Sequence, residues 1–414
     1  MMKKIAGLLL SLLVIFGLVT GCKSQGNTTE GGVIRDIFAG SANVFILRED
    51  NTLWAAGYNR SGQFGQDLSG EPRITRLIDD SGQAITGVKS VAAGESHAVI
   101  LKDDGTLWGA GDSSSGELGQ NGGRLSVFTR LKAQDNPLAG IKTVAAGNNS
   151  TFFIDGENSL WAAGYNYYGE LGLGNRDTSH PSFRQVEGAG QNVKALAAGL
   201  RHTVLLKEDG ALWAAGYNYF GQLGLGDTED RNSFTEVKSA GSDITAVAAG
   251  NYHTVILKSD GSVWATGSNF WGQLGFYGEN AGNNFTQALD EKGSPLTGVK
   301  QIAARGSITV IQKADGSLLV AGDFASPEPA PVPDYSFSAS GSKQETGTSS
   351  FVPLVPEQGA ASKLGDVKKI VLGYNSIYVI DSDGRLWAAG SNRYGQLNLG
   401  PDTEASSTLK LIDF

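Results

Sequence analysis

Three of the four histidines in this 414-residue chain recur in one sequence context, so they are the first candidates for chemistry. His97, His202 and His253 each follow a small-residue run, in VAAGESH, LAAGLRH and VAAGNYH. Imidazole nitrogens are common metal ligands, and histidines related by a repeat can converge on one ion. The matching positions in other copies of this context are Asn43, Ser150, Ile308 and Ser376. Because serine and asparagine replace the imidazole, we expect a hydrogen bond at a strand end and no metal site.

Two glutamates share one sequence position with an amide residue. Glu117 and Glu170 stand where other copies have Gln63, Gln222, Gln273 and Gln396. A position that accepts both the acid and the amide indicates hydrogen bonds to nearby backbone and not proton transfer. His180 has no evident partner, and no Ser-His-Asp set, phosphate loop or calcium loop can be assigned. We therefore predict no catalytic residue, no metal, no cofactor and no enzyme activity.

Pairs of aromatic residues indicate a binding surface. They occur in three successive copies of a glycine-rich phrase, GYNYYGELG, GYNYFGQLG and GSNFWGQLG, whereas two other copies have Arg60–Ser61 and Ser114–Ser115 there. Tyrosine, tryptophan and arginine dominate the binding energy of protein interfaces. With residues of neighbouring turns, the candidate partner-binding set is Tyr167, Tyr168, Tyr219, Phe220, Phe270, Trp271, Tyr252, Arg201 and Tyr394. In the alternative interpretation, one aromatic of each pair packs between neighbouring sheets.

The positions of these motifs are set by an internal repeat. Alignment on a tryptophan gives spacings of 51 to 54 residues between the first five copies. The tryptophans are Trp54, Trp108, Trp161, Trp213, Trp264 and Trp387. The last gap is about twice as long, and Leu319 in GSLLVAGD fills the missing position. The chain therefore holds seven copies.

Each copy predicts four short β-strands. A strand that ends in a small-residue run is followed by an apolar strand such as HTVLLK, a tight turn such as EDG, the strand LWAAG and a weaker strand such as FTEVK. The residue three before the tryptophan position is always glycine or asparagine, the types that tolerate the positive φ of a tight hairpin. The small-residue runs suit strands that converge on an axis. The pattern predicts an all-β protein with one domain, a seven-bladed β-propeller of four-stranded blades.

The phrases GYNYFGQLGLGD and AAGNYHTVILKSDGSVWATGSN strongly resemble the repeats of the regulator of chromosome condensation family. The resemblance covers nearly all of residues 33–414 and implies the same seven-bladed propeller. Copy six departs most, because Arg305 replaces the glycine of AAG and a Pro/Ser-rich insertion is expected at about residues 323–365. The light-sensing plant members use a tryptophan cluster that begins in GWRHT. This chain has GLRHT instead, so we expect that chromophore to be missing.

The N-terminal segment predicts export and lipidation. Two lysines precede an apolar run in MMKKIAGLLLSLLVIFGLVTGC, the layout of a secretory signal. The run ends in LVTGC, which resembles the lipobox of bacterial lipoproteins and contains Cys22, the sole cysteine. We expect a signal peptide over residues 1–21, a palmitate-type lipid on Cys22, a flexible tether over residues 22–32, and a location on the extracytoplasmic side of a bacterial cell membrane. The alternative is an ordinary signal peptide or uncleaved anchor helix with an incidental cysteine.

The charge and the motifs together rank the possible functions. A formal net charge of -9 argues against nucleic-acid binding, which needs a concentrated basic face. The leading hypothesis is a monomeric, lipid-anchored scaffold that binds a protein or a cell-wall glycan through its aromatic face. Some secreted bacterial family members inhibit β-lactamases through aromatic-rich loops, so the resemblance implies an enzyme inhibitor as the alternative. An enzyme with its site in the central channel or in the insertion is the third hypothesis.

Overall fold

The structure of this protein is a computed structural model. It describes residues 33–67, 74–120, 122–133, 136–276, 282–324, 348–358, 364–400 and 402–412. The predicted signal peptide, Cys22 and the tether lie outside the described residues, as does most of the predicted insertion. Among the described residues, no helix has the length and apolar character needed to cross a membrane.

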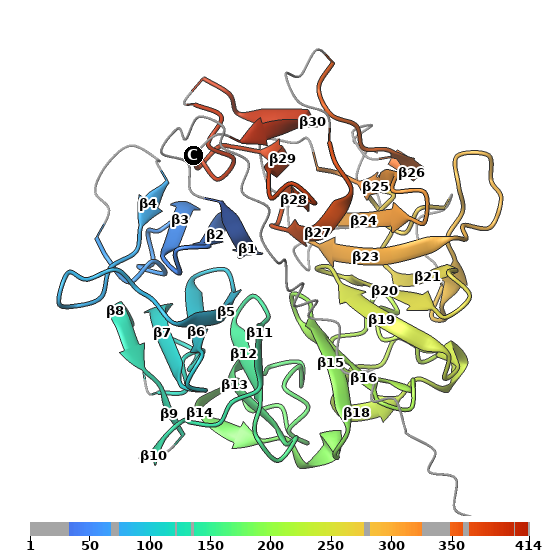
Figure 1. Ribbon diagram of the computed structural model, residues 1–414. Helices are drawn as coiled ribbons and strands as arrows, with labels where there is room; N and C mark the ends of the chain where they lie inside the picture. The colour runs from blue at the N-terminus through green and yellow to red at the C-terminus, as the bar shows by residue number, and fades with distance from the viewer. Residues whose placement is uncertain are drawn as a thin grey trace, which may run out of the picture. The chain divides into compact units, whose positions relative to one another are not determined.

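Seven four-stranded antiparallel sheets lie around a common centre in the described part of the unit Gly32–Phe414 (Figure 1). The four strands of each sheet are consecutive in sequence, so each repeat copy forms one sheet. The prediction of an all-β, seven-bladed propeller is confirmed. We number the sheets one to seven in chain order.

The first strand of each sheet is the innermost, and the second strand pairs with its outer side (Figure 1). The innermost strands are β1 (Ile34–Ala39), β5 (Val88–Ala93), β11 (Thr143–Ala146), β15 (Val193–Ala198), β19 (Ile244–Ala249), β23 (Val299–Arg305) and β27 (Val367–Leu372). The second strands are β2 (Asn43–Arg48), β6 (His97–Lys102), β12 (Ser150–Ile154), β16 (His202–Lys207), β20 (His253–Lys258), β24 (Ile308–Lys313) and β28 (Ser376–Asp381).

The third strands carry the repeat tryptophans, with Leu319 in their place in sheet six, and the fourth strands lie at the rim (Figure 1). The third strands are β3 (Leu53–Gly57), β7 (Leu107–Asp112), β13 (Leu160–Tyr165), β17 (Leu212–Gly216), β21 (Val263–Gly267), β25 (Leu318–Gly322) and β29 (Leu386–Ser391). The fourth strands are β4 (Thr75–Arg76), β8 (Arg124–Arg130), β14 (Ser179–Gln185), β18 (Arg231–Glu236), β22 (Thr286–Gln287), β26 (Thr348–Pro353) and β30 (Ala405–Ile412). The connections to the next sheets contain the short strands β9 (Lys132–Ala133) and β10 (Asn136–Pro137) and the 3-10 turns η1 (Glu187–Ala189) and η2 (Lys238–Ala240). Because β26 pairs with β25, the range 323–365 predicted as an insertion includes the fourth strand of sheet six.

The tight turns between the second and third strands have the predicted backbone conformation. Their asparagine or glycine residues have φ between 63° and 88°. The members are Asn51, Gly105, Asn158, Gly210, Gly261, Gly316 and Gly384. This left-handed conformation is open to glycine and asparagine at little cost, which explains why the position accepts only these two residue types.

Apolar side chains fill the space between neighbouring sheets. In one cluster, Phe152 and Leu160 of sheet three pack with Leu205 and Ala215 of sheet four. Second strands such as β16 and β20 are buried along most of their length, whereas innermost strands such as β15 and β23 are half-exposed to the central channel. Each sheet therefore depends on its neighbours to cover its apolar faces.

The ring closes by contact between the first and last sheets, each built from its own four strands. Lys369 of β27 forms an ion pair with Asp36 of β1 at 2.5 Å and donates a hydrogen bond to the Ile37 carbonyl at 3.1 Å. The backbone N–H of Tyr374 donates to the Ser41 carbonyl at 2.7 Å. Among the described residues, closure thus uses side-by-side packing, with each of these two sheets formed from four consecutive strands.

The three repeated histidines link successive sheets, which confirms the predicted strand-end hydrogen bond. Each Nε2 lies at hydrogen-bond distance from a threonine Oγ1 of the next sheet. The pairs are His97–Thr151 (2.9 Å), His202–Thr254 (3.0 Å) and His253–Thr309 (3.0 Å). The Thr254 and Thr309 hydroxyls donate their hydrogens to the carbonyls of Gln222 and Gln273. The imidazole Nε2 of His202 and His253 must therefore carry the proton and donate.

We expect these buried histidines to make folding sensitive to acid. Burial lowers the pKa of His97 and His202 to about 4 and that of His253 to about 3, from an ordinary value of 6.5. The unfolded chain therefore binds these protons first, and the free energy of unfolding falls as the pH drops from about 6.5 toward 4, by up to about 1.4 kcal/mol per pH unit for each histidine. Urea unfolding at pH 7.5 and pH 5 measures this slope.

The variant His202→Ser introduces the residue that sheets three and seven have at Ser150 and Ser376. It should be less stable than the parent at pH 7.5 by about 1 kcal/mol, because one hydrogen bond between sheets is lost. Its loss of stability between pH 7.5 and pH 5 should be smaller than that of the parent. An unchanged slope would show that His202 is not buried in its neutral form.

Candidate binding face

The loops after the third strands and the turns between the first and second strands lie at the same end of the sheets. The Gln63 side chain in the loop of sheet one donates to the Glu95 carbonyl in the turn of sheet two at 3.4 Å. Arg201 in the turn of sheet four donates to the Tyr168 hydroxyl in the loop of sheet three at 3.1 Å. We call this end, with loops such as 166–174 and turns such as 199–201, the loop face. The candidate residues of the loops and those of the neighbouring turns therefore lie on one face.

In the loops of sheets one to five and seven, the glutamate or glutamine accepts a hydrogen bond from the backbone N–H two residues earlier, as predicted for this position. The pairs are Gln63 with Ser61 (3.2 Å), Glu117 with Ser115 (2.9 Å), Glu170 with Tyr168 (2.9 Å), Gln222 with Phe220 (3.0 Å), Gln273 with Trp271 (2.9 Å) and Gln396 with Tyr394 (2.9 Å). The loop asparagine adds a second bond, because the Asn218 Oδ1 accepts from the Leu223 N–H at 2.9 Å. The polar residues of the repeat thus fix the loop backbone and leave the tip residues free to vary.

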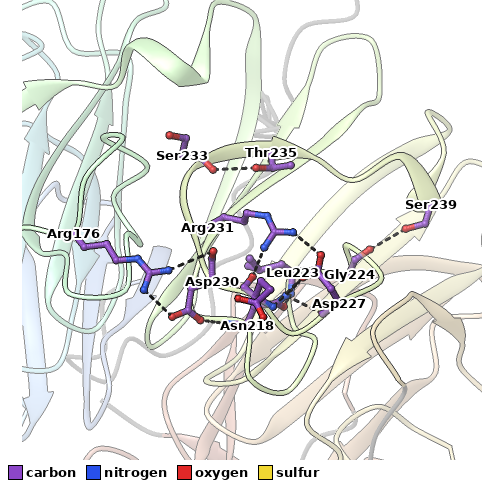
Figure 2. Close-up of polar contacts among 11 residues, drawn as sticks. Arg176, Asn218, Leu223, Gly224, Asp227, Asp230, Arg231, Ser233, Thr235 and Ser239 are labelled. Atoms are coloured by element: carbon purple, nitrogen blue, oxygen red, sulfur yellow. Dashed lines mark hydrogen bonds and ion pairs between the residues drawn. The ribbon is translucent and has the colours of Figure 1, made fainter.

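Further polar contacts anchor the loop after β17 (Figure 2). The Asn218 side chain donates to the Asp227 carbonyl, and the Asn218 N–H donates to the Asp230 carboxylate, both at 2.9 Å. Arg231 pairs with the Asp227 carboxylate at 2.5 Å. From the preceding sheet, Arg176 lies 3.5 Å from the Asp230 carboxylate. The loop is therefore held both at its own base and by its neighbour.

An aromatic cluster lies on the loop face over sheets three, four and five. Its buried members are Tyr168, Tyr217 and Tyr252, and Tyr165, Leu200 and Phe220 pack against them. The Tyr217 ring centroid lies 4.8 Å from that of Tyr168 and 6.0 Å from that of Tyr252, both edge-to-face. Edge-to-face pairs are a favourable aromatic geometry, worth about 0.5–1.5 kcal/mol each. Tyr217 is thus the centre of the cluster.

The two residues of each aromatic pair have different roles. The first residue is exposed: Tyr167 at 52%, Tyr219 at 66% and Phe270 at 53%. The second residue packs inward, buried for Tyr168 and half-buried for Phe220 and Trp271. The Phe220 centroid lies 5.1 Å from that of Tyr219 and 5.8 Å from that of Phe270. We call the connected set of Tyr167, Tyr168, Tyr217, Tyr219, Phe220, Tyr252 and Phe270 the aromatic arc.

The candidate residues of the sequence therefore divide into groups. Tyr168 and Tyr252 were expected to contact a partner, but both are buried. Tyr168 packs against the exposed Tyr167, and Tyr252 packs against Tyr217 and Phe220. Arg201 stacks on Tyr168, with its guanidinium 5.0 Å from the ring centroid. Tyr394 is half-buried and pairs with Tyr58 at 5.2 Å, outside the aromatic arc.

Tyr217 is the central residue of the aromatic arc that the sequence did not indicate. It directly follows the glycine of LWAAG, where sheet three has Tyr165 and sheet one has Tyr58, and where other copies have residues such as Asp112 or Ser268. A tyrosine here in two successive copies that also carry aromatic pairs was the available signal. Burial raises the pKa of Tyr217 to about 12, so the phenol stays protonated and neutral at physiological pH.

Glu170 lies beneath this cluster as a buried acid. Burial raises its pKa to about 8, and its Oε1 has no hydrogen-bond partner among the described residues. The neutral carboxylic acid carries one hydrogen, so at pH 7 it resembles the glutamine of the other copies. Across the described part of the chain, no three His, Cys, Asp or Glu side chains are grouped to hold a metal ion.

The sequence matches a known repeat. The regulator of chromosome condensation (RCC1) repeat matches residues 157–206 and 209–257, and a second form of its pattern matches residues 34–63, 88–117, 193–222, 244–273 and 367–396. Together these matches span half of the chain and fall in six of the seven sheets. The chain belongs to the RCC1 repeat family. Sheet six, which the sequence marks as the most divergent, lies outside the matches.

Similar proteins with this repeat include a plant receptor. The ultraviolet-B receptor UVR8 of Arabidopsis thaliana is 33% identical over 287 residues, which cover 68% of this chain and 63% of the receptor. The chain thus spans less than two thirds of this curated relative.

Solved structures share the fold at lower sequence identity. The structure of Kap60 bound to yeast RCC1 (Prp20) matches with a TM-score of 0.68 and 19% identity, covering 97% of this chain and 91% of that chain. Prp20p from Saccharomyces cerevisiae, described with its binding to Gsp1p and histones, matches with a TM-score of 0.67 and 17% identity, covering 92% and 88%.

We expect Glu170→Gln to stabilise the protein at alkaline pH. In the parent, the folded-state pKa of Glu170 is about 8 and the ordinary value is 4.5, so the unfolded chain loses this proton first. The stability contributed by the neutral acid is complete below about pH 4.5 and is lost as the pH rises toward 8, with a slope of up to about 1.4 kcal/mol per pH unit. Glutamine keeps the backbone contact at any pH. Chemical unfolding at pH 5 and pH 8.5 should show a larger gain for the variant at pH 8.5.

The reverse change, Gln222→Glu, is the matched control, because Gln222 makes the same contact one sheet later. It should introduce a new loss of stability between pH 5 and pH 8.5. If both variants keep the pH profile of the parent, Glu170 ionises normally and the proposed burial effect is absent.

Proposed function

We propose that this protein binds a partner protein on the aromatic arc of its loop face. The proposal rests on one observation: three exposed aromatic rings pack on a cluster of buried and half-buried rings. Among the described residues, six large apolar or aromatic side chains are exposed, and three of them are Tyr167, Tyr219 and Phe270. Clustered exposed aromatics on rigid loops are typical of binding surfaces.

The geometry supports binding at low entropic cost. The loop backbones are fixed by their Glu, Gln and Asn side chains, and each exposed ring packs on a neighbouring ring. A partner would therefore meet a surface that is largely preorganised, which favours affinity. The relatives agree with such a role: yeast RCC1 (Prp20) was solved with Kap60 bound, and UVR8 is a receptor.

A triple variant tests the arc. Tyr167→Ser, Tyr219→Ser and Phe270→Ser place at each tip the residue that sheet two has at Ser114. We expect affinity for the partner to fall by at least about tenfold, since central aromatic anchors often contribute 2 kcal/mol or more each. The measurement is quantitative mass spectrometry of envelope proteins retained by the immobilised full chain, followed by titration of the retained protein.

The matched control replaces exposed valines elsewhere, Val127 and Val355, with serine. It should retain the same protein with parental affinity. Equal retention by the triple variant would exclude the arc as the binding surface. The glycan alternative would be favoured if the parent retains a purified cell-wall glycan and the triple variant still retains every protein that the parent retains. Inhibition of a β-lactamase panel would identify the partner as that enzyme class.

We also propose that a lipid on Cys22 anchors the protein to the extracytoplasmic side of a bacterial cell membrane. The proposal rests on the apolar run and the LVTGC motif of the sequence. Cys22→Ser should move the protein from the detergent phase to the aqueous phase in a two-phase detergent extraction. The mass of the mature parent should exceed that of its polypeptide by the lipid. An unmodified Cys22 in the purified parent would overturn this proposal.

A further inference from the structure

Arg305 departs from the repeat at the end of the innermost strand of sheet six. The other six sheets have glycine there: Gly40, Gly94, Gly147, Gly199, Gly250 and Gly373. A Cβ atom on Gly250 would lie 2.0 Å from the His253 ring, and one on Gly199 would lie 2.4 Å from the His202 ring. Sheet six has Ile308 in place of that histidine. The imidazole that a Cβ atom would meet in sheets two, four and five is therefore absent from sheet six, although sheets one, three and seven also lack it and keep glycine.

The Arg305 side chain extends across the central channel. Its Nη2 donates to the carbonyl of Ala93 at 3.0 Å. Ala93 ends the innermost strand of sheet two, and sheets seven and one lie between sheet six and sheet two along the ring. The Arg305 Nε is buried and has no hydrogen-bond partner within the described residues. The Arg305 guanidinium also forms no ion pair with any described residue. Burial lowers the pKa of Arg305 to about 10, so the group stays positively charged at pH 7.

Other polar groups surround Arg305 where the channel opens onto the loop face. The Asn251 side chain donates a hydrogen bond to the Tyr374 hydroxyl, so the hydroxyl hydrogen remains available to a further acceptor. Burial raises the pKa of Tyr374 to about 12, which keeps that hydrogen in place. Glu95 is exposed at the same mouth and is the acid that stabilises the charge of Arg305, without forming an ion pair.

The mouth of the channel is continuous with the aromatic arc. Asn251 directly precedes Tyr252, which packs 5.3 Å from Phe220 and 6.0 Å from Tyr217. The backbone N–H of Asn251 donates to the Gly306 carbonyl, next to Arg305, at 2.8 Å. A partner that covers the arc would therefore also cover the channel mouth.

We propose that the channel mouth binds an acidic side chain, Asp or Glu, of the protein that docks on the aromatic arc. The Arg305 guanidinium and the Tyr374 hydroxyl supply the hydrogen-bond donors. The partner's carboxylate supplies the negative charge that pairs with the guanidinium. Hydrogen bonds between a guanidinium and a carboxylate are about twice as strong as neutral ones, and a half-buried site screens them little. This inference rests on the proposed function, because it adds a subsite to the same face.

The test uses a displayed library of random twelve-residue peptides, selected on the immobilised full chain. We expect the enriched peptides to carry an Asp or Glu together with apolar residues. Arg305→Gly should weaken their binding by at least about tenfold, equivalent to about 1.4 kcal/mol. Replacing the peptide acid with its amide should have a similar effect on the parent and little effect on Arg305→Gly.

Two control variants separate charge recognition from a structural role of Arg305. Arg305→Gly restores the residue of the other six sheets, and its unfolding transition shows whether the cross-channel bond to Ala93 matters for folding. Glu95→Gln removes the competing negative charge and should tighten the binding of acidic peptides while leaving amide peptides unchanged. A purely structural Arg305 would alter the unfolding transition but would not change the preference for acidic over amide peptides.

The outcomes distinguish the two proposals. Peptides that lose binding in Tyr219→Ser but lack an acid, or that tolerate Arg305→Gly, would overturn the acidic subsite and leave the aromatic face intact. Acidic peptides that depend on Arg305 but not on Tyr219 would support the subsite and count against the arc. Failure to enrich any peptide that depends on Arg305 overturns the inference.

Discussion

Packing between neighbouring sheets is the interaction on which this molecule depends. The apolar clusters join consecutive sheets, as where Val255 and Leu257 of sheet five pack with Ile311 and Ala321 of sheet six. A single four-stranded sheet would leave both apolar faces in water, so it gains stability only when sheets stand on both sides of it. The last step is closure between β27 and β1, which brings together residues more than three hundred positions apart, such as Lys369 and Asp36. Cooperative folding of the whole ring follows from this dependence.

The same packing separates residues that hold the fold from residues that are free to change. In the loops of sheets one to five and seven, an Asn (Ser113 in sheet two) and a Glu or Gln bind backbone, and buried threonines tie the loop carbonyl to the next sheet, as Thr203 does with the Glu170 carbonyl at 2.8 Å. The two tip residues contribute only backbone groups to this network, and their side chains take no part in it. They can therefore be serine in sheet two and aromatic in sheet three without changing the backbone. The loop backbone therefore does not depend on the side chains of the aromatic arc, and contacts between the rings hold those side chains in place.

Much of the fold could be predicted because a repeat supplies seven observations of each position. The strands, the positive φ of the turns at residues such as Asn51 and Gly210, and the backbone-binding role of Glu170 all follow from residue types that recur or substitute for one another. Which aromatic of each pair would be buried could not be predicted, because the burial of Tyr168 depends on Arg201 and Tyr217 of the next sheet. The contact of Arg305 with Ala93 could not be predicted either, since 212 residues separate them. The lengths of the fourth strands range from two residues in β4 to eight in β30. They follow no repeat pattern and so could not be predicted from the sequence.

Departures from the repeat are the more informative part of such a sequence, because six other copies show what the scaffold requires. In sheet six, Ile308 stands in place of the histidine of sheets two, four and five, and Arg305 stands in place of the glycine whose Cβ atom would meet that imidazole. The aromatic pairs of sheets three to five and Arg305 of sheet six are neighbours around the ring, and all of them face the same end. Aromatic residues and arginine gathered on one face have the composition of a protein-binding surface.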